Sequence, residues 1–394
     1  MNNQRMGYRF FKYKRKLDLD WHPNPQTGSA AAFLWGPRQT GKTTYLRDSF
    51  PGARWFDLLD GDLRAELSVR PALFRERLLA TLPEIVVVDE IQEVPELLSE
   101  IHALLERTPI RFVLCGSSAR KLRRKSGNLL GGRAIEYHLF PLTTQEVPDL
   151  ELDRALNHGL LPAHYQSDDP RPHLRAYVNA YLRQEIIEES ATRNIPAFTR
   201  FLTVAGLTHG QQLNYANMAR ETGVAAATVR SYYQILEETL LGFTLEPWRK
   251  TRKRRLVETA KFYLFDVGVA NYLNPEADQV TEGSERYGRS FEHFILNEVR
   301  AALAYRGLDT PVSFWRTSSG FEVDLIVGDM QLAVECKSSR QIRNDDLRGL
   351  RALREEAAVG RAIVVSREQE PRITHDGIEI LPWQVFCARL PELL

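Results

Sequence analysis

The chain has 394 residues, of which 43% are hydrophobic and 26% are charged, and its formal net charge at pH 7 is +1. This length predicts two or three domains that each bury a core. The near-neutral charge provides no overall field that would draw the chain to nucleic acid or to a membrane. The three scattered cysteines, Cys115, Cys336 and Cys387, lack metal-ligand spacing and argue against a disulfide framework. No apolar run reaches the roughly 20 residues that span a bilayer, so we expect a cytoplasmic protein without a membrane partner.

Residues 1–28 mix basic and aromatic side chains and end in the turn-rich stretch HPNPQTG. We expect an N-terminal arm and linker there, which packs on the next domain as a short amphipathic helix. The alternative is an arm that contacts nucleic acid.

The stretch GPRQTGKT, residues 36–43, matches the pattern G-x-x-x-x-G-K-[ST] and follows the apolar run AAAFLW. A buried strand, a tight loop and a helix in this order aim consecutive backbone N–H groups at one anion. We therefore expect a nucleotide-binding loop in which Lys42 reaches the β- and γ-phosphates and the Thr43 hydroxyl ligates Mg²⁺. The alternative is a glycine-rich turn. The expected cofactor-binding residues are Gly36, Pro37, Arg38, Gln39, Thr40, Gly41, Lys42, Thr43 and Thr44.

From residue 29 to about residue 145, strand-like and helix-like stretches alternate, which is typical of a parallel α/β sheet. EIVVVDE, residues 84–90, is a continuous apolar run that ends in two acids, as in a strand buried on both faces. In P-loop ATPases the first acid, here Asp89, holds the Mg²⁺ shell, and Glu90 would orient or deprotonate the attacking water. The other expected elements are strands in RWFDLLD (54–60), RFVLCGSS (111–118) and AIEYHLF (134–140) and a helix in LFRERLLATL (73–82).

The order GPRQTGKT, VVVDEIQEV, LCGSSARKL, GGRAIEYHLFPLT resembles the AAA+-type ATPase domains of a large prokaryotic family in which a domain of unknown function follows the ATPase. The resemblance covers nearly the whole chain and implies an additional-strand parallel sheet, with ATP and Mg²⁺ as cofactors. It implies that Ser117 or Ser118 senses the γ-phosphate or positions water. It also makes Arg133 similar to the arginine that such proteins present to nucleotide, in cis or across a subunit boundary; the alternative is a surface charge. A homo-oligomer follows, with a hexameric ring as one arrangement.

Residues 146–208 have apolar spacing of three and four, which predicts a helical lid and connector. Residues 209–280 predict a winged helix-turn-helix, with a turn at Gly223 between two helices. The second helix turns Val229, Tyr233 and Leu236 inward. Its outer face would present Thr228, Arg230, Ser231 and Gln234.

The basic stretch at 249–255 and the strand KFYLFD (261–266) would form the wing. The polar outer face of the second helix and the basic charge of the wing would both suit DNA, which favours contact with DNA. The alternative is a helical protein-binding module with a solvated basic loop.

Residues 281–394 begin with an amphipathic helix, followed by SFWRTSSGFEVDLIV and QLAVECKSS, which we interpret as two strands joined by the turn GDM. Glu335 and Lys337 are two residues apart in the second strand and project together. With Asp324 in the first strand, they resemble the Asp…Glu-x-Lys signature of restriction-endonuclease-like nucleases, and Glu292 matches the helix acid that these often add. The resemblance implies a second metal site in which Lys337 activates water. Such folds also serve as DNA-binding modules, so cleavage stays open.

Together these patterns predict an α/β protein with a P-loop ATPase core (29–145), a helical lid, a winged helix-turn-helix and a smaller restriction-endonuclease-like domain. We expect ATP hydrolysis, with Glu90, Lys42, Arg133 and Ser117 as catalytic residues, coupled to work on DNA that includes branched DNA. One alternative is an ATP-gated DNA-binding regulator without translocation. The other is a signalling ATPase that binds protein partners.

Overall fold

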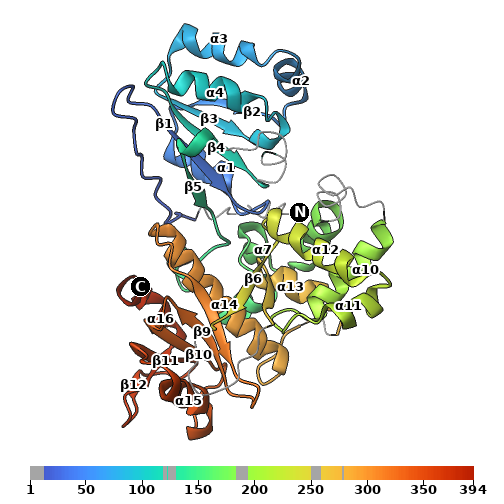
Figure 1. Cartoon of the computed structure of the whole chain (residues 1–394), viewed down its shortest axis with the longest axis vertical. Helices are drawn as coiled ribbons and strands as arrows, with labels where there is room; N and C mark the ends of the chain where they lie inside the picture. Colours follow the sequence, from blue (N-terminus) through green and yellow to red (C-terminus); the bar gives the residue numbers. More distant parts are fainter. Residues whose placement is uncertain (1–12, 119–121, 123–129, 183–193, 250–258, 277–278) are drawn as a thin grey trace, which may run out of the picture.

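The computed structural model of the chain describes residues 13–118, 122, 130–182, 194–249, 259–276 and 279–394. These residues form a five-stranded sheet and an eight-stranded sheet. Figure 1 shows the smaller sheet and its helices in blue and green above the larger sheet, and a helical layer in green and yellow beside the larger one. No helix in the described residues is long and apolar enough to cross a membrane.

The first sheet is parallel, with the strand order β2-β3-β4-β1-β5. Because β4 lies between β1 and β3, the expected additional-strand arrangement is confirmed. The strands are β1 (Ala30–Trp35), β2 (Arg54–Asp57), β3 (Ile85–Asp89), β4 (Arg111–Gly116) and β5 (Ala134–His138). The helices around them are α1 (Lys42–Ser49), α2 (Gly61–Val69), α3 (Ala72–Thr81) and α4 (Leu97–Leu105).

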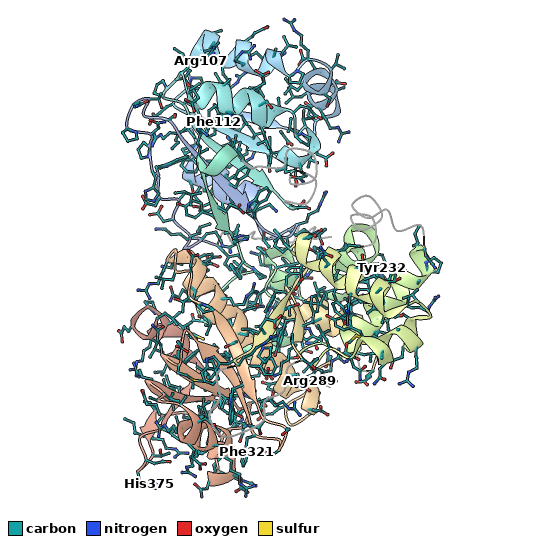
Figure 2. All side chains as sticks on the ribbon, viewed as in Figure 1. Arg107, Phe112, Tyr232, Arg289, Phe321 and His375 are labelled. Atoms are coloured by element: carbon teal, nitrogen blue, oxygen red, sulfur yellow. The ribbon has the colours of Figure 1, made fainter. Side chains whose placement is uncertain are left out.

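Both faces of this sheet are covered, which explains the continuous apolar runs in its strands. Alternate residues of β4 belong to different cores: Phe112 packs with α2, α3 and α4, whereas Val113 packs with α1 and the N-terminal arm. Figure 2 shows Phe112 inside this upper part of the molecule. Leu17 and Leu19 of the arm are buried in the second core, so the arm packs on the sheet as an extended segment. The expected helix in the arm is therefore wrong for the described residues from 13 onward.

The segment 146–208 is helical, as expected, although residues 183–193 lie outside the described residues. Tyr177–Leu182 continues α8 with wider, π-helical turns. Tyr232 of α12 packs edge-on against Phe198 of α10, with ring centroids 4.9 Å apart, inside the layer that Figure 2 shows at the right. The helices are α6 (Leu152–His158), α7 (Pro162–Gln166), α8 (Arg171–Ala176), α10 (Ile195–Leu207), α11 (Tyr215–Thr222), α12 (Ala226–Glu238) and α13 (Val267–Leu273).

The two helices predicted on either side of Gly223 are confirmed as α11 and α12. Gly223 ends α11 with φ 70°, a left-handed conformation that favours glycine and permits the sharp turn. The three residues expected to face inward, Val229, Tyr233 and Leu236, are buried. Their burial on one side leaves the opposite side of α12 to solvent.

The second sheet is mixed, with the order β12-β13-β11-β10-β9-β8-β6-β7. Its strands are β6 (Gly242–Pro247), β7 (Lys261–Leu264), β8 (Val312–Arg316), β9 (Glu322–Val327), β10 (Leu332–Cys336), β11 (Arg361–Ser366), β12 (Arg372–Ile373) and β13 (Glu379–Pro382). The helices that flank it are α14 (Glu285–Tyr305), α15 (Arg348–Glu356) and α16 (Trp383–Leu393).

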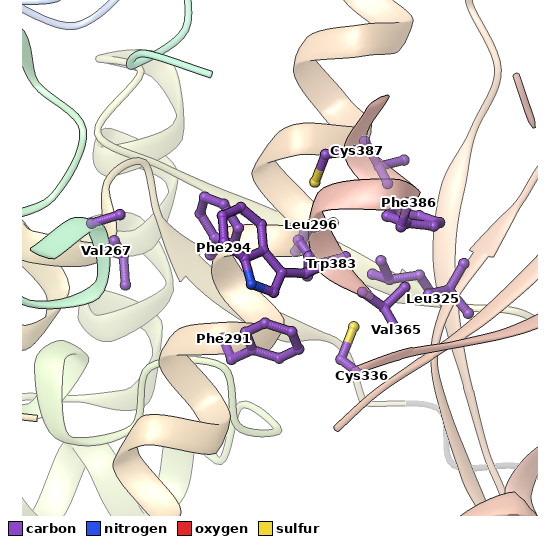
Figure 3. Packing of buried hydrophobic residues seen from close by; sticks show 14 of the residues in the cluster. Val267, Phe291, Phe294, Leu296, Leu325, Cys336, Val365, Trp383, Phe386 and Cys387 are labelled. Carbon is purple, nitrogen blue, oxygen red and sulfur yellow. The ribbon is translucent and has the colours of Figure 1, made fainter. Parts of the chain in front are cut away.

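Helices α14 and α16 cover one face of this sheet and α15 covers the other. Figure 3 shows Phe291 and Phe294 of α14 around Trp383 of α16, beside Val365 of β11. The rings of Phe294 and Trp383 have centroids 5.7 Å apart in an edge-to-face arrangement. This packing fixes α14, which carries several of the predicted site residues, against the sheet.

Two expectations for this region need correction. The stretch SFWRTSSGFEVDLIV forms two antiparallel strands, β8 and β9, because Gly320 takes φ 93° and the Thr317 N–H donates to the Phe321 carbonyl at 2.9 Å to close a turn. In addition, β6 pairs with β8 at Pro247 and Phe314. The sheet therefore crosses the boundary expected at residue 281, and the hairpin β6–β7 is shared between the two expected domains.

Candidate functional site

The loop between β1 and α1 is tightly closed. A Cβ at Gly36 would lie 2.6 Å from the Leu139 carbonyl oxygen, so a larger residue would force the backbone apart. Gln39 and Gly41 have φ of 65° and 91°, the left-handed conformations that a narrow turn requires. The loop therefore has the compact shape that the phosphate-binding motif predicts.

Lys42 and Thr43 occupy the first turn of α1. The Lys42 ammonium is buried and donates to the carbonyls of Gly36 at 2.7 Å and Pro37 at 3.0 Å. The Thr43 hydroxyl donates to Asp89 Oδ2 at 2.7 Å. The two groups predicted to share Mg²⁺ thus lie side by side, and they fit a nucleotide-bound Mg²⁺, which takes few protein ligands besides phosphate and water.

Glu90 follows β3 in a left-handed conformation, with φ 55° and ψ 48°. Its carboxylate accepts from the Gln92 side-chain amide and from the Ser117 hydroxyl, which lies 3.3 Å away at the end of β4. A backbone held in this rare region is typical of functional sites. The structure therefore brings the predicted Glu90 and Ser117 together. We call residues 36–44 with Asp89, Glu90 and Ser117 the nucleotide edge.

Gln92 was not predicted as a site residue. Its Nε2 also lies 3.2 Å from Ser117 Oγ, and a Cβ at Gly116 would come within 2.5 Å of its Oε1, so the glycine makes room for it. Gln92 lies two residues after Glu90, within the motif stretch VVVDEIQEV. This position is the sequence signal that could have identified it.

Arg133 is not brought to the nucleotide edge of its own chain. It precedes β5, which runs parallel to β1 with Ala134 opposite Ala31, and so lies at the other end of the sheet from the loop. There Arg133 Nε donates to Glu106 Oε1 at 2.9 Å. The role in cis is therefore wrong for this fold, whereas a contact across a subunit boundary stays a prediction.

Arg15 of the N-terminal arm reaches the same loop, and nothing in its sequence context predicted this. Its guanidinium donates to the Thr40 carbonyl at 2.6 Å. From the helical segment, the Tyr177 hydroxyl donates to the Arg38 carbonyl at 3.4 Å. Because these partners are far apart in the sequence, a motif search could not have found either contact.

The second predicted site consists of Glu292 of α14, Asp324 of β9 and Glu335 of β10, with Lys337. Glu322 of β9, which was not predicted, lies beside them, and we call the four acids the acidic cluster. Lys261 of β7 lies inside it. Its ammonium pairs with Glu292 Oε1 and with Glu322 Oε1, both at 2.9 Å. Although burial disfavours the charged amine, these carboxylates outweigh it and hold the pKa of Lys261 well above its usual value.

The other members of the acidic cluster also have partners within the chain. The Cys336 N–H donates to Asp324 Oδ2 at 2.7 Å, and Lys337 Nζ lies 2.6 Å from Glu335 Oε1, as the shared strand face predicts. Burial and the neighbouring Glu335 raise the pKa of Asp324 well above its usual range. Among the residues that the structure describes, no group of three acidic, histidine or cysteine side chains is arranged to hold a metal. Lys261 supplies a positive charge beside Glu292, and the second metal site stays a prediction.

The predicted DNA-contacting face of α12 is accessible. Arg230, Ser231 and Gln234 are exposed, and Thr228 is half-buried. The Arg230 guanidinium lies 4.9 Å above the ring of Tyr215, which holds it on the surface. Of the basic stretch at 249–255, only Arg249 lies within the described residues.

Comparison with known proteins identifies three segments. Residues 29–148 match the AAA domain family, residues 149–280 match a domain of unknown function (DUF8612), and residues 287–386 match another domain of unknown function (DUF4143). The chain is 31% identical over 307 residues to uncharacterized proteins of Mycobacterium tuberculosis and Mycobacterium bovis, with 75% of this chain aligned. It spans 66% of the length of these relatives.

Among solved structures, a signal transduction ATPase with numerous domains and a tetratricopeptide repeat sensor, from Pyrococcus horikoshii, aligns with 15% identity and a TM-score of 0.21. The alignment covers 71% of this chain and 46% of that one. The fold and the nucleotide edge define a P-loop ATPase. More specifically, residues 29–148 form an AAA-type ATPase domain, and domains of unknown function follow it, as the sequence predicted.

Proposed function

We propose that this chain hydrolyses ATP at the nucleotide edge and uses the cycle to act on DNA. The observation that carries the proposal is the pairing of the Thr43 hydroxyl with Asp89 at 2.7 Å, next to Glu90 and at the mouth of the phosphate-binding loop. This arrangement joins the loop that cradles phosphate to the acid that follows a central strand, which is the combination that phosphoryl transfer requires.

Each residue of the nucleotide edge has a role in this reaction. Lys42 exchanges its two carbonyl partners for the β- and γ-phosphates when nucleotide enters. Mg²⁺ bound with the nucleotide, next to Thr43 and Asp89, supplies charge neutralisation for the phosphates. Glu90 orients a water molecule and accepts its proton, while Ser117 and Gln92 hold the carboxylate in place.

The exposed face of α12 supports DNA as the partner. Arg230 and Gln234 can donate to phosphates or bases, and Gly223 sets the turn of a helix-turn-helix before them. The basic stretch at 249–255 would add phosphate contacts that do not depend on sequence. Branched DNA is one substrate that a chain with several DNA-facing elements could accept.

We further propose that the nuclease-like C-terminal domain binds DNA without cleaving it. Lys261 is fixed beside the carboxylates that were predicted to hold metal, at 2.9 Å from Glu292 of that set and at 2.9 Å from the neighbouring Glu322. Displacing a buried, doubly paired ammonium is costly. The domain then acts as a scaffold.

The active form is proposed to be a homo-oligomer, with a hexameric ring as one arrangement. Arg133 supports this because it is 44% exposed in its side chain and lies at the edge opposite its own loop. From there it can reach the nucleotide of a neighbouring subunit, and a closed ring of identical contacts would give every subunit such a neighbour.

The experiment is ATP turnover by the full chain with and without linear, flapped and four-way DNA, in parallel with Glu90→Gln. We expect DNA to stimulate turnover of the wild type, and we expect Glu90→Gln to bind ATP but to hydrolyse it about 100-fold more slowly. DNA binding that requires ATP but leaves turnover unchanged would favour a DNA-binding regulator without translocation. Indifference to DNA would favour a signalling ATPase with protein partners, and unchanged turnover in Glu90→Gln would overturn the assignment of Glu90.

A further inference from the structure

Arg15 of the N-terminal arm connects the phosphate-binding loop to α14. Its side chain is only 5% exposed. The guanidinium donates to the Thr40 carbonyl at 2.6 Å and to the Tyr305 hydroxyl at 3.0 Å. It also donates to the Phe140 carbonyl at 2.6 Å and to Glu146 Oε1 at 3.0 Å. A planar, five-donor guanidinium suits such a site because its donors point in fixed directions.

The bond to Thr40 fixes one peptide of the loop. The Thr40 carbonyl and the Gly41 N–H belong to the same peptide group, and the described residues contain no cis peptide bond. In a trans peptide these two groups point in opposite directions. When Arg15 holds the carbonyl toward the arm, the Gly41 N–H is aimed away from the arm, toward the interior of the loop where phosphate binds.

A second contact acts on the loop in the same way. The Tyr177 hydroxyl donates to the Arg38 carbonyl at 3.4 Å, and the next residue, Gln39, has φ 65°. Two carbonyls of the loop are therefore bonded by side chains from outside the sheet. The orientation of the loop amides thus depends on segments that the phosphate-binding motif does not include.

The far side of Arg15 is anchored just as firmly. Tyr305 is the last residue of α14, and its hydroxyl also accepts from the Phe140 N–H at 3.2 Å. Burial raises the pKa of Tyr305, so it stays neutral. Burial alone would lower the pKa of Arg15, but Tyr305 and Glu146 outweigh it and the pKa is raised, so the guanidinium stays charged.

We propose that Arg15 is a positioning residue of the nucleotide site, which holds the Thr40–Gly41 peptide in its phosphate-binding orientation, and that Tyr305 holds Arg15. Nucleotide affinity then depends on where the C-terminal end of α14 places Tyr305. Because the same helix carries Glu292 and His293 into the second sheet, a change there reaches the loop through one rigid element. The inference rests on nucleotide binding at this loop, which is part of the proposed function.

The test measures the Kd of a fluorescent ATP analogue and the steady-state turnover of the full chain. The variants are Arg15→Met, Arg15→Lys and Tyr305→Phe, with Glu298→Gln as the matched control. Glu298 accepts from Thr144 at the same junction but does not contact the loop. Tyr305→Phe should raise the Kd about 3- to 10-fold, because it removes the hydroxyl that accepts from Arg15 and from the Phe140 N–H. Arg15→Met should raise it about 10- to 100-fold, and Arg15→Lys should fall between.

Turnover at saturating ATP should stay within about twofold of the wild type, because Arg15 does not touch the reacting phosphate. The double variant Arg15→Met with Tyr305→Phe should bind no more weakly than Arg15→Met alone, since Tyr305 acts through Arg15. Glu298→Gln should change the melting temperature without changing the Kd.

The outcomes separate this inference from the proposed function. If the wild type binds no nucleotide, both fall. If the wild type binds while Arg15→Lys and Tyr305→Phe match it, only the inference falls, and the same holds if Glu298→Gln loses as much affinity as Tyr305→Phe. Should Arg15→Met fail to fold, Tyr305→Phe decides, because its ring and its packing on Phe140 are retained.

Discussion

The nucleotide edge of the first sheet and the acidic cluster of the second sheet both bring carboxylates and a lysine together, but the partners of the lysine differ. At the nucleotide edge, Asp89 accepts from a neutral hydroxyl, and the nearby Lys42 ammonium is held by backbone carbonyls. In the acidic cluster, Glu292 and Glu322 share the ammonium of Lys261.

This difference determines which region can accept a charged ligand. Lys42 loses only neutral partners when it turns toward a phosphate, so the exchange costs little and gains a charge-assisted contact. Lys261 would have to leave two carboxylates in a buried place, which costs far more. Clustered carboxylates are thus insufficient to identify a metal site, because a nearby lysine can supply the positive charge instead.

The largest effect should come from Lys42→Ala. Removing the ammonium deletes the only side-chain charge that the motif assigns to the phosphates, so we expect nucleotide binding to be lost. Equilibrium binding of a fluorescent ATP analogue measures this. If a folded Lys42→Ala variant still bound nucleotide, Lys42 would not be the group that accepts the phosphates, and the contrast with Lys261 would not hold.

The next largest effect should come from Lys261→Met. It leaves Glu292 without its cation and Glu322 with Arg316 alone, which should destabilise the fold by about 3–5 kcal/mol. Millimolar Mn²⁺ should restore part of the lost melting temperature, because the vacated place is surrounded by oxygen ligands. The control is Arg70→Met, which breaks the exposed Arg70–Glu76 pair and should cost at most about 1 kcal/mol. A Lys261→Met variant as stable as the wild type and indifferent to Mn²⁺ would contradict our interpretation of the acidic cluster.

A smaller effect concerns Glu298, which lies at the junction between the two regions. Burial raises the pKa of Glu298 to about 7, against hydrogen bonds from Thr144 that lower it. Since this pKa is above the ordinary glutamate value of 4.5, the folded chain binds more protons than the unfolded chain between pH 4.5 and 7, and stability falls as pH rises through this window.

Glu298→Gln should therefore match the wild type near pH 5 and exceed it by about 1–3 kcal/mol near pH 8. Thermal unfolding at a series of pH values measures the difference. Glu285→Gln, an exposed position on the same helix, is the control and should show no such trend. A constant difference across the pH range would mean that Glu298 is ionised throughout.

The smallest effect should appear when Arg133→Ala and Glu90→Gln subunits, each inactive alone, are mixed. If Arg133 acts across a boundary, random mixing in equal amounts gives intact copies of both residues at about a quarter of the sites. ATP turnover of the mixture measures this recovery, with each variant alone as the control. If a mixed oligomer shows no recovery, then each nucleotide edge is built from one chain only, as the acidic cluster is.

The parts of this fold that could be predicted from sequence are those in which cause and consequence are close along the chain. The continuous apolar run at 85–89 predicts a strand buried on both faces, because each face of such a strand needs apolar residues. The loop at 36–43 could be predicted because Gly36 and Gly41 permit its tight backbone. The inward face of α12 followed from helical spacing. In each of these cases a local pattern is sufficient.

The parts that could not be predicted depend on distant partners. Lys261 reads as an ordinary strand residue, and only the pairing of β6 with β8 brings it to Glu292 and Glu322. Arg15 reads as one of several cations in a basic arm, yet it bonds to Tyr305 at the end of α14. No local pattern indicates which cation of a basic stretch is buried.

The shared hairpin β6–β7 has a consequence for the order in which the chain can fold during synthesis. Pro247 can pair with β8 only after its partner Phe314 has been synthesised. At about 5–20 residues per second the wait is roughly 3 to 13 s, during which the outer side of β6 is an unpaired edge. An unpaired edge invites pairing with another chain. Fragments that stop before β8 should therefore aggregate, whereas fragments that extend through β13 should stay in solution.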